Sequence, residues 1–186
     1  MTPPLLQGEL VRLVAINTSQ DADLLTRWTR DTEYWRLLDA TPARAWTQTQ
    51  GREFVKREFE TERPETFAFS IRARDDDRLV GEIDLGGVLW TQGDAFVGIG
   101  IGERELWGKG YGTDAMRVLL RFAFQELNLH RVSLTVYGYN LRAQRAYAKI
   151  GFQVEGRARQ VLLRDGQRHD VIFMSILQNE WQTIYG

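Results

Sequence analysis

A glycine-rich turn between two strongly patterned segments is the sequence feature that most constrains the fold of this chain. Three of the six residues in WGKGYG, residues 107–112, are glycine. The turn follows residues 94–102, which alternate as a strand does, and leads into residues 111–127, whose apolar positions recur at helical spacing. Glycine loses more backbone freedom on folding than any other residue. The pattern therefore indicates either a tight turn or backbone amides left open to an anion at a helix N-terminus.

The strand before the turn, DAFVGIGIG, carries only small residues on part of one face. Alternate residues of a strand point to opposite faces of the sheet. One face holds Ala95, Val97, Ile99 and Ile101, and the other holds Gly98, Gly100 and Gly102. Because glycine weakens a strand interior, we expect a bulge there, or the close approach of another backbone or a ligand.

Two common nucleotide-binding motifs are excluded at this turn by their spacing. A P-loop has four residues between its first glycine and its Gly-Lys-Ser/Thr end. Here five residues separate Gly102 from Gly108, and Gly110 stands in place of the hydroxyl residue. A dinucleotide-binding loop reads Gly-x-Gly-x-x-Gly, but Gly112 comes one residue too early. The turn therefore belongs to neither class.

The remaining pattern predicts a single mixed α/β domain over residues 1–186. It has an antiparallel start, a central βαβ unit, a further helix and a closing hairpin. The hairpin is predicted from Asp165-Gly166, a strong two-residue turn signal. We expect strands near 9–15, 66–73, 78–90, 94–102, 131–137, 152–164 and 168–177, and helices near 20–30, 46–60, 111–127 and 140–150. A turn is expected at Asp75–Asp77, and the aromatic pair Tyr34 and Trp35 lies between the first two helices. The last helix should have its N-cap at Asn140 and its C-cap at Gly151.

Composition excludes several kinds of site. The chain has no cysteine, so it has no disulfide, no thiolate nucleophile and no Cys-type zinc site. Its two histidines, His130 and His169, make a His-ligated metal site improbable, and we expect no metal. No apolar run approaches the roughly 20 residues of a membrane helix, and MTPPLLQGEL lacks the features of a secretory signal. We therefore expect a cytoplasmic location.

The charges are unevenly distributed although the net charge is only -1. Residues 103–170 contain 12 Lys and Arg against 7 Asp and Glu, whereas the rest of the chain contains 12 against 18. This asymmetry fits a protein that holds an anionic ligand and meets a cationic one, although chance is the alternative. Nucleic-acid binding is disfavoured, because no basic and aromatic array accompanies the net acidic charge.

Four motifs in order resemble the GNAT family of acetyl-CoA-dependent N-acetyltransferases. They are Trp107–Thr113 with Asp114-Ala115, then HRVSLTV, then NLRAQRAYAKIGF, and last EGR with the Asp-Gly hairpin. The chain is most similar to the branch of ribosomal-protein N-terminal acetyltransferases. The resemblance is strong over residues 94–177 and looser over the first 90 residues.

The resemblance implies that acetyl-CoA is the cosubstrate and that backbone amides of the glycine turn hold its diphosphate. The family loop reads Arg/Gln-x-x-Gly-x-Gly/Ala, so Trp107 replaces the usual Arg or Gln. The family also splays two strands before this loop, which frees backbone groups for the pantetheine arm. Arg145 and Lys149 either bind the 3′-phosphate or form a solvated face. The implied cofactor residues are Gly100, Ile101, Gly102, Trp107, Gly108, Lys109, Gly110, Tyr111, Gly112, Thr113, Asn140, Ala143, Ala146, Tyr147 and Lys149.

The resemblance also implies direct transfer in a ternary complex, with Tyr147 as the acid that protonates the departing thiolate. A phenol with a pKa of about 10 stays protonated at rest. A backbone N–H of the strand at 99–102 is the expected oxyanion stabiliser. From the helical pattern alone, Tyr147 shares a face with Ala143 and Ala146, so a core aromatic is the alternative.

An attacking amine must be neutral, and an alkyl amine with a pKa of about 10.4 needs a base to become so. Glu82 and Asp84, on one face of the predicted strand, are the candidate bases, with Glu103 as a further carboxylate. A solvated strand face is the alternative for these residues. His130 is expected to be structural and His169 to lie on the surface.

The acceptor stays open at this point: a protein N-terminus or a small-molecule amine both fit. Trp28, Tyr34 and Trp35 either line its pocket or belong to the core. A non-catalytic acyl-CoA-binding sensor or interaction module is the alternative function, since the same glycine loop would serve it. Homodimers are frequent in the family, so a homodimer is a further possibility.

Overall fold

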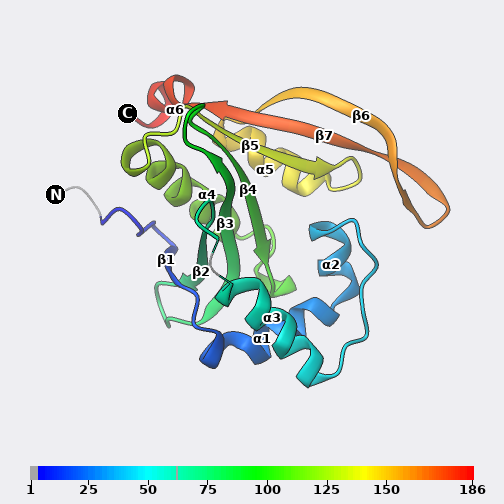
Figure 1. Ribbon diagram of the computed structural model, residues 1–186. Coiled ribbons are helices and arrows are strands. Elements are labelled where there is room, and N and C mark those ends of the chain that lie inside the picture. Colours follow the sequence, from blue (N-terminus) through cyan, green and yellow to red (C-terminus); the bar gives the residue numbers. More distant parts are fainter. Residues whose placement is uncertain (1–3, 62) are drawn as a thin grey trace.

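One seven-stranded sheet organises the chain (Figure 1). The computed structural model describes residues 4–61 and 63–186. The strands are β1 (Val11–Ala15), β2 (Phe67–Ala73), β3 (Leu79–Leu89), β4 (Asp94–Ile101), β5 (Arg131–Tyr137), β6 (Gln153–Arg164) and β7 (Gln167–Leu177). Their order is β1-β2-β3-β4-β5-β7-β6, and every neighbouring pair is antiparallel except β4 and β5. The predicted mixed, mostly antiparallel sheet is confirmed.

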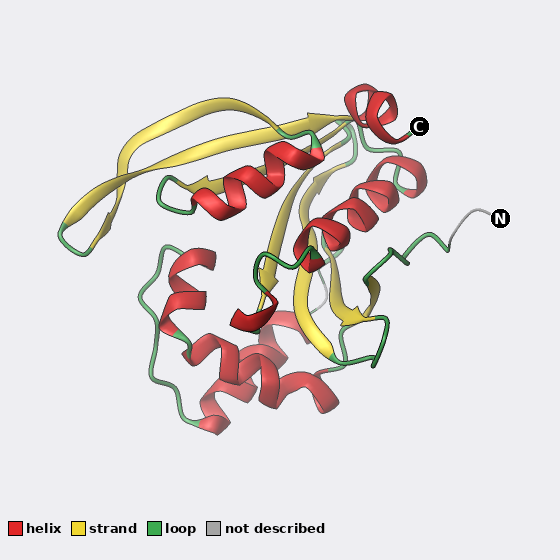
Figure 2. Cartoon of the chain, turned by 180° about the vertical axis from the view of Figure 1, so that it is seen from behind, coloured by secondary structure: helices red, strands yellow, loops and turns green. Residues whose placement is uncertain are grey.

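The helices divide into a cluster at one end of the molecule and three elements along the sheet. Helices α1, α2 and α3 gather below the sheet in both views, opposite the C-terminal α6 (Figures 1 and 2). The connection from β4 to β5 through α4 is the predicted central βαβ unit. Within the described residues the helices are α1 (Thr18–Arg30), α2 (Thr32–Leu38), α3 (Gln48–Glu60), the 3-10 turn η1 (Arg104–Leu106), α4 (Tyr111–Arg121), the π turn η2 (Phe122–Glu126), α5 (Leu141–Ile150) and α6 (Gln178–Tyr185).

Three features differ from the expectation. Tyr34 and Trp35 do not lie in a connection but form part of α2, which begins because the Asp31 carboxylate accepts the amides of Glu33 and Tyr34. The helix predicted over 111–127 is regular only to Arg121 and then widens into the π turn η2. The C-terminal helix α6 was not predicted at all; its Trp181 packs against Phe124 of that turn.

The predicted boundaries of α5 are confirmed. The Asn140 side chain accepts the amide of Ala143 at 3.2 Å, which satisfies one of the free donors at the helix N-terminus. The helix ends at Gly151, whose backbone is left-handed. Both caps are fixed by local sequence, so the direction in which α5 leaves β5 is also fixed locally.

A buried carboxylate on α4 holds the N-terminal segment, residues 4–11, against that helix. Asp114 accepts the amides of Glu9, Leu10 and Val11 at 3.2, 2.8 and 3.0 Å. Further along α4, the Arg121 guanidinium donates to the carbonyls of residues 4, 5 and 7. The start of β1 and the helix after the glycine turn are therefore one packed unit.

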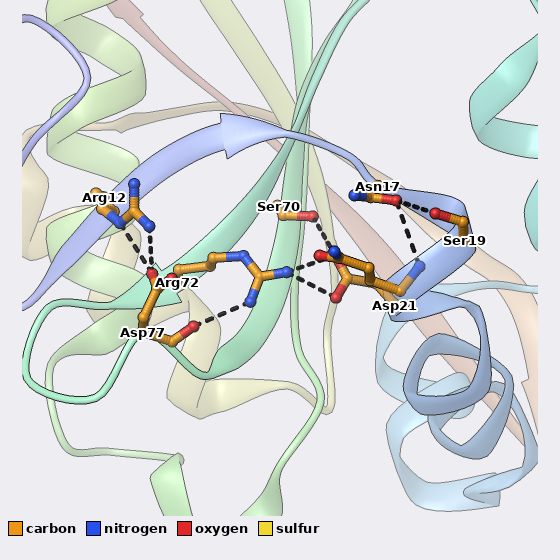
Figure 3. A network of polar contacts seen from close by, with 8 residues as sticks. Arg12, Asn17, Ser19, Asp21, Ser70, Arg72 and Asp77 are labelled. Atoms are coloured by element: carbon orange, nitrogen blue, oxygen red, sulfur yellow. Dashed lines mark hydrogen bonds and ion pairs between the residues drawn. The ribbon is translucent and has the colours of Figure 1, made fainter.

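A second buried carboxylate joins α1 to the sheet (Figure 3). Asp21 accepts two hydrogen bonds from the Arg72 guanidinium, at 2.7 and 2.8 Å, and a longer one from the Ser70 hydroxyl. Arg72 also donates to the backbone carbonyl of Asp77. Because the Asp21 and Arg72 side chains are only 7% and 17% exposed, loss of either partner leaves a charge buried without compensation.

Asp21→Ala should lower the free energy of unfolding by about 3 kcal/mol, because it leaves the half-buried Arg72 guanidinium without its carboxylate partner. Urea denaturation followed by circular dichroism measures this change. Asp23→Ala is the matched control: it removes an ion pair with Arg52 that is exposed on both sides, and it should change stability little. Equal effects of the two substitutions would contradict a structural role for the Asp21 pair.

Candidate active site

The glycine turn ends in a set of unpaired backbone amides. Gly108 and Gly110 have φ values of +77° and +94°, a region that other L residues rarely adopt. Helix α4 begins directly after them, so the amides of residues 111–113 have no intrahelical acceptor. No other acceptor for these amides lies within the described part of the chain. Together with the helix dipole they form a site suited to an anion such as a phosphate.

Strands β4 and β5 part after a short paired stretch. Their parallel pairing covers only residues 94–96 and 131–133, although β4 continues to Ile101 and β5 to Tyr137. The parting is visible in Figure 1, where the two strands lie together near α6 and diverge away from it. This is the splay that the family resemblance implied.

The parting exposes particular backbone groups of β4. The Gly102 amide donates to the Val80 carbonyl of β3, and alternate residues of an antiparallel strand face opposite neighbours. The backbone groups of Ile99 and Ile101 therefore face β5, from which they are now separated. Their amides are placed to donate to a group in the gap.

A cleft of about 370 Å³ occupies this parting. It is lined by β4, by the glycine turn and by α5, which come from separate segments of the chain. Twelve of the predicted cofactor residues line it: Gly100, Ile101, Trp107, Gly108, Gly110, Gly112, Thr113, Asn140, Ala143, Ala146, Tyr147 and Lys149. The other three, Gly102, Lys109 and Tyr111, are not among its lining residues.

The Trp107 side chain contacts the end of β4 and the side chain of Arg142. Its indole Nε1 donates to the Ile101 carbonyl at 2.6 Å. The Arg142 guanidinium of α5 lies 3.9 Å from the centre of its ring, a cation–π contact. Trp107 thus satisfies a β4 carbonyl that the parting of the strands leaves without a partner.

Tyr147 faces the cleft from α5 alongside Ala143 and Ala146. It is partly buried and packs near Phe152, and its hydroxyl has no hydrogen-bond partner within the described residues. Burial raises the pKa of this phenol to about 12, so the group is protonated at neutral pH. Such a hydroxyl can donate a proton to an atom in the cleft.

A second pocket, of about 260 Å³, lies on the glycine face of β4. Helices α1, α2 and α3 form its outer wall, and β3 and β4 form its floor. Four acidic and four aromatic side chains line it, and among the described residues none of the lining side chains is basic. These eight are Asp39, Glu58, Glu82, Asp84, Tyr34, Trp35, Phe54 and Phe59.

Glu82 and Asp84 lie on the floor of this pocket, so a solvated strand face is the wrong interpretation for them. Burial raises the pKa of Glu82 to about 7, although a hydrogen bond from Tyr34 opposes the shift. Burial and the nearby Glu58 raise the pKa of Asp84 to about 6. Both carboxyls therefore change charge close to neutral pH, as a proton acceptor must.

Other expected polar residues lie elsewhere. Glu103 is a structural partner that accepts the Trp28 indole N–H at 3.0 Å and pairs with Arg27. Trp28 is buried beside Gly102, so it belongs to the core. His169 packs edge-on against Tyr139.

The two cavities meet at β4, where Tyr34, Leu38, Ile99 and Gly100 line both. The Tyr34 hydroxyl donates to Glu82 at 2.5 Å. A Cβ on Gly100 would overlap this hydroxyl, which explains why glycine stands there. The expectation of a bulge, or of another backbone against the glycine face, was wrong: the register with β3 is regular here, and side chains of Tyr34 and Trp28 approach the glycines instead.

Sequence reasoning missed several residues of the two cavities. Tyr34, which lines both, was considered only as a pocket or core aromatic. Neither Ile99, which also lines both, nor Arg142, which lines the first cleft, was singled out. Their roles depend on helices packed across the sheet, which leave no local signal. The glycines on one face of β4 were the one sign in the sequence that a bulky group packs against that face.

Comparison with known proteins agrees with this geometry. The family model described as "Acetyltransferase (GNAT) domain" matches residues 11–153. The chain belongs to the GNAT acetyltransferases. Members of this family use acetyl-CoA as their cosubstrate.

Relatives and solved structures bear out the same family. The Bacillus subtilis protein that bears the name "Putative ribosomal N-acetyltransferase YdaF" is 36% identical over 107 residues, which are 58% of each chain. The Escherichia coli [ribosomal protein uS5]-alanine N-acetyltransferase is 27% identical over 117 residues, 62% of this chain and 59% of that one. The match thus spans less than two thirds of either relative. Spermidine N-acetyltransferase from Vibrio cholerae, solved with CoA and spermine, shares the fold with a TM-score of 0.79 and 21% identity, covering 93% and 98% of the two chains.

Two further kinds of site are not found in the part of the chain that the structure describes. No cluster of three or more His, Cys, Asp or Glu side chains there could hold a metal ion. None of the helices described is both long and apolar enough to cross a membrane.

The raised pKa of Glu82 predicts how stability depends on pH. The folded state holds a proton on this carboxyl up to about pH 7, whereas an unfolded chain releases it near its ordinary value of 4.5. The free energy of unfolding should therefore fall as pH rises between these values. Urea titrations between pH 5 and pH 8 should show a smaller fall for Glu82→Gln than for the wild type. Glu53→Gln, at an exposed position of α3, is the control and should show the same fall in the free energy of unfolding as the wild type. If Glu82→Gln also showed the wild-type fall, the raised pKa of Glu82 would be contradicted.

Proposed function

We propose that this protein is an acetyl-CoA-dependent N-acetyltransferase that acts on a primary amine within a ternary complex. The observation that carries the proposal is the meeting of two cavities at one strand, with unpaired amides on one side and buried carboxylates on the other. An activated acyl group in one cavity and an amine in the other can thereby reach each other beside Gly100. A cytoplasmic location and a homodimer stay predictions of the sequence.

The residues of the first cleft fit CoA. The amides of residues 111–113 suit its diphosphate, and the backbone groups of Ile99 and Ile101 suit its amide-bearing arm. Acetyl-CoA supplies the acetyl group as an activated thioester. An amide of the parted strand, from Ile99 or Ile101, would stabilise negative charge on the carbonyl oxygen during transfer.

Transfer requires two proton movements. The amine nitrogen forms a bond to the acetyl carbon, and the bond from that carbon to sulfur breaks. Tyr147 gives a proton to the departing sulfur, and its raised pKa of about 12 keeps the phenol protonated before the transfer. Glu82 or Asp84 takes the proton that the amine loses, directly or through water, because each titrates near neutral pH. The chain has no cysteine to carry the acetyl group, which favours direct attack.

The lining of the second pocket supports a cationic amine with an apolar body as the acceptor. Asp84 makes no hydrogen bond or ion pair to any described residue, so its charge is available to an ammonium group. Trp35, Phe54 and Phe59 line the pocket and give it an aromatic, apolar surface, and aromatic rings attract cations. Among proteins with the same fold, one was solved with spermine and one relative is named for a ribosomal-protein alanine, so both polyamines and peptide N-termini belong in the test.

Release of free CoA thiol in the presence of an amine panel tests the proposed function. The panel should contain alkyl and arylalkyl monoamines, spermine, an alanine-terminated peptide and anionic amino acids. We expect turnover with cationic amines that carry an apolar body and none with anionic amino acids. Binding of acetyl-CoA without thiol release from any amine would instead support the non-catalytic acyl-CoA-binding module.

Asp84→Asn and Phe54→Ala should each raise the KM for the preferred amine about tenfold, because each removes part of the acceptor pocket. Calorimetric titration should show the affinity for acetyl-CoA unchanged in both variants. Glu53→Gln, on the exposed side of α3, is the control and should leave both quantities as in the wild type. An altered affinity for acetyl-CoA with an unchanged KM for the amine would show that the pocket is not the acceptor site.

Tyr147→Phe should lower kcat about a hundredfold, in the range expected for loss of a general acid, while the affinity for acetyl-CoA changes little. Steady-state kinetics and calorimetry measure the two quantities. Tyr185→Phe is the matched control, because that hydroxyl only donates to the Ile150 carbonyl. Equal kcat values for Tyr147→Phe and the wild type would exclude Tyr147 as the proton donor.

A further inference from the structure

A cation–π contact spans the mouth of the first cleft. Trp107 lies at the start of the glycine turn, and Arg142 lies in the first turn of α5, on the other wall. The guanidinium carbon of Arg142 lies 3.9 Å from the centre of the Trp107 ring. The two walls of the cleft are therefore joined by one side-chain pair.

The ring in this pair is fixed in place. Trp107 is partly buried, and its Nε1 donates to the Ile101 carbonyl at 2.6 Å. A ring held by its edge in this way offers one face to the cleft. Arg142 occupies that face, so the position of its guanidinium is set by the ring rather than by a carboxylate.

The charge of Arg142 has no anionic partner among the described residues. Arg104 provides a comparison, because it also lies near the Trp107 ring, at 5.9 Å, but is paired with Asp31. Partial burial lowers the pKa of Arg142, which means that its surroundings disfavour the charge. An anion bound in the cleft would offset this cost.

The stacked geometry also suits one kind of anion. The Arg142 guanidinium carbon lies 3.9 Å from the ring centre, and its N–H groups make no hydrogen bond to a described residue, so they can donate in pairs to phosphate oxygens. The open amides of residues 111–113 lie in the same turn that Trp107 begins. We propose that Arg142, oriented by Trp107, binds the diphosphate of CoA from the α5 side and completes the anion site that the amides begin.

The inference rests on the proposed use of acetyl-CoA, and it assigns a function to the tryptophan that replaces the family's usual Arg or Gln. Arg142 is then a cofactor-binding residue, and Trp107 is a positioning residue that acts through it.

Calorimetric titration with CoA and with dephospho-CoA, which lacks the 3′-phosphate, tests the assignment. Arg142→Ala should weaken binding of both ligands by the same factor, about tenfold or more, which is the range for a charged hydrogen-bonded contact. It should also reduce the salt dependence of binding. Arg159→Ala, which removes an exposed arginine of β6, should bind both ligands as the wild type does.

Substitutions of Trp107 separate positioning from packing. Trp107→Leu should weaken CoA binding about as much as Arg142→Ala, and the double variant should be little worse than either, since coupled residues are not additive. Trp107→Phe keeps a ring face but loses the bond to Ile101, so it should bind more tightly than Trp107→Leu.

Three results would overturn the proposal. They are unchanged CoA affinity in Arg142→Ala, a loss confined to CoA but not dephospho-CoA, and additive effects of the Trp107→Leu and Arg142→Ala changes. The second result would place Arg142 at the 3′-phosphate. Failure of the wild type to bind CoA would refute the proposed function as well, whereas each of the three results leaves that function intact.

Discussion

The parting of β4 from β5 is the constraint on which the rest of the structure depends. A parallel pair that stayed bonded to its end would use the backbone groups of Ile99 and Ile101 within the sheet. Leaving a buried backbone group unpaired costs about 1–3 kcal/mol, so the open strand must be held by its surroundings. Helix α4 packs on one face of β4, and the first helices pack on the other. The Trp107 indole pairs with the carbonyl that the parting leaves at the end of the strand.

The same strand separates two chemically opposite environments. Its edge toward β5 faces open amides and cations that have no ion-pair partner among the described residues, and its glycine face meets buried carboxylates and aromatic rings. The uneven charge of the sequence corresponds to this division, since the basic part of the chain supplies α5 and the acidic part supplies β3 and the first helices. An anionic cosubstrate and a cationic acceptor would thus each be attracted to its own side of the strand.

Sequence reasoning succeeded where the signal was local. The glycine turn, the two caps of α5 and the Asp-Gly hairpin are each specified within a few residues, and the structure has all three. It failed where a role depends on distant segments. The burial of Glu82 is caused by helices that precede it by more than twenty residues, and the stacking of Arg142 on Trp107 joins residues that are 35 positions apart. No periodicity in the chain carries that information, so these residues could be chosen only after the elements were placed in space.

The bonds from Asp114 to the amides of Glu9, Leu10 and Val11 have a consequence for how the molecule assembles. The partners are more than a hundred residues apart, so closing this contact carries the high entropic cost of a long loop. A ribosome must have released residues well beyond α4 before residues 9–11 can dock on that helix. The anion-binding end of α4 therefore acquires this support only after the helix has been synthesised, and residues 9–11 have no such partner until then. Removal of residues 9–11 would take away the hydrogen bonds that hold Asp114 and the start of α4, and so would destabilise the glycine turn, although these residues line neither cavity.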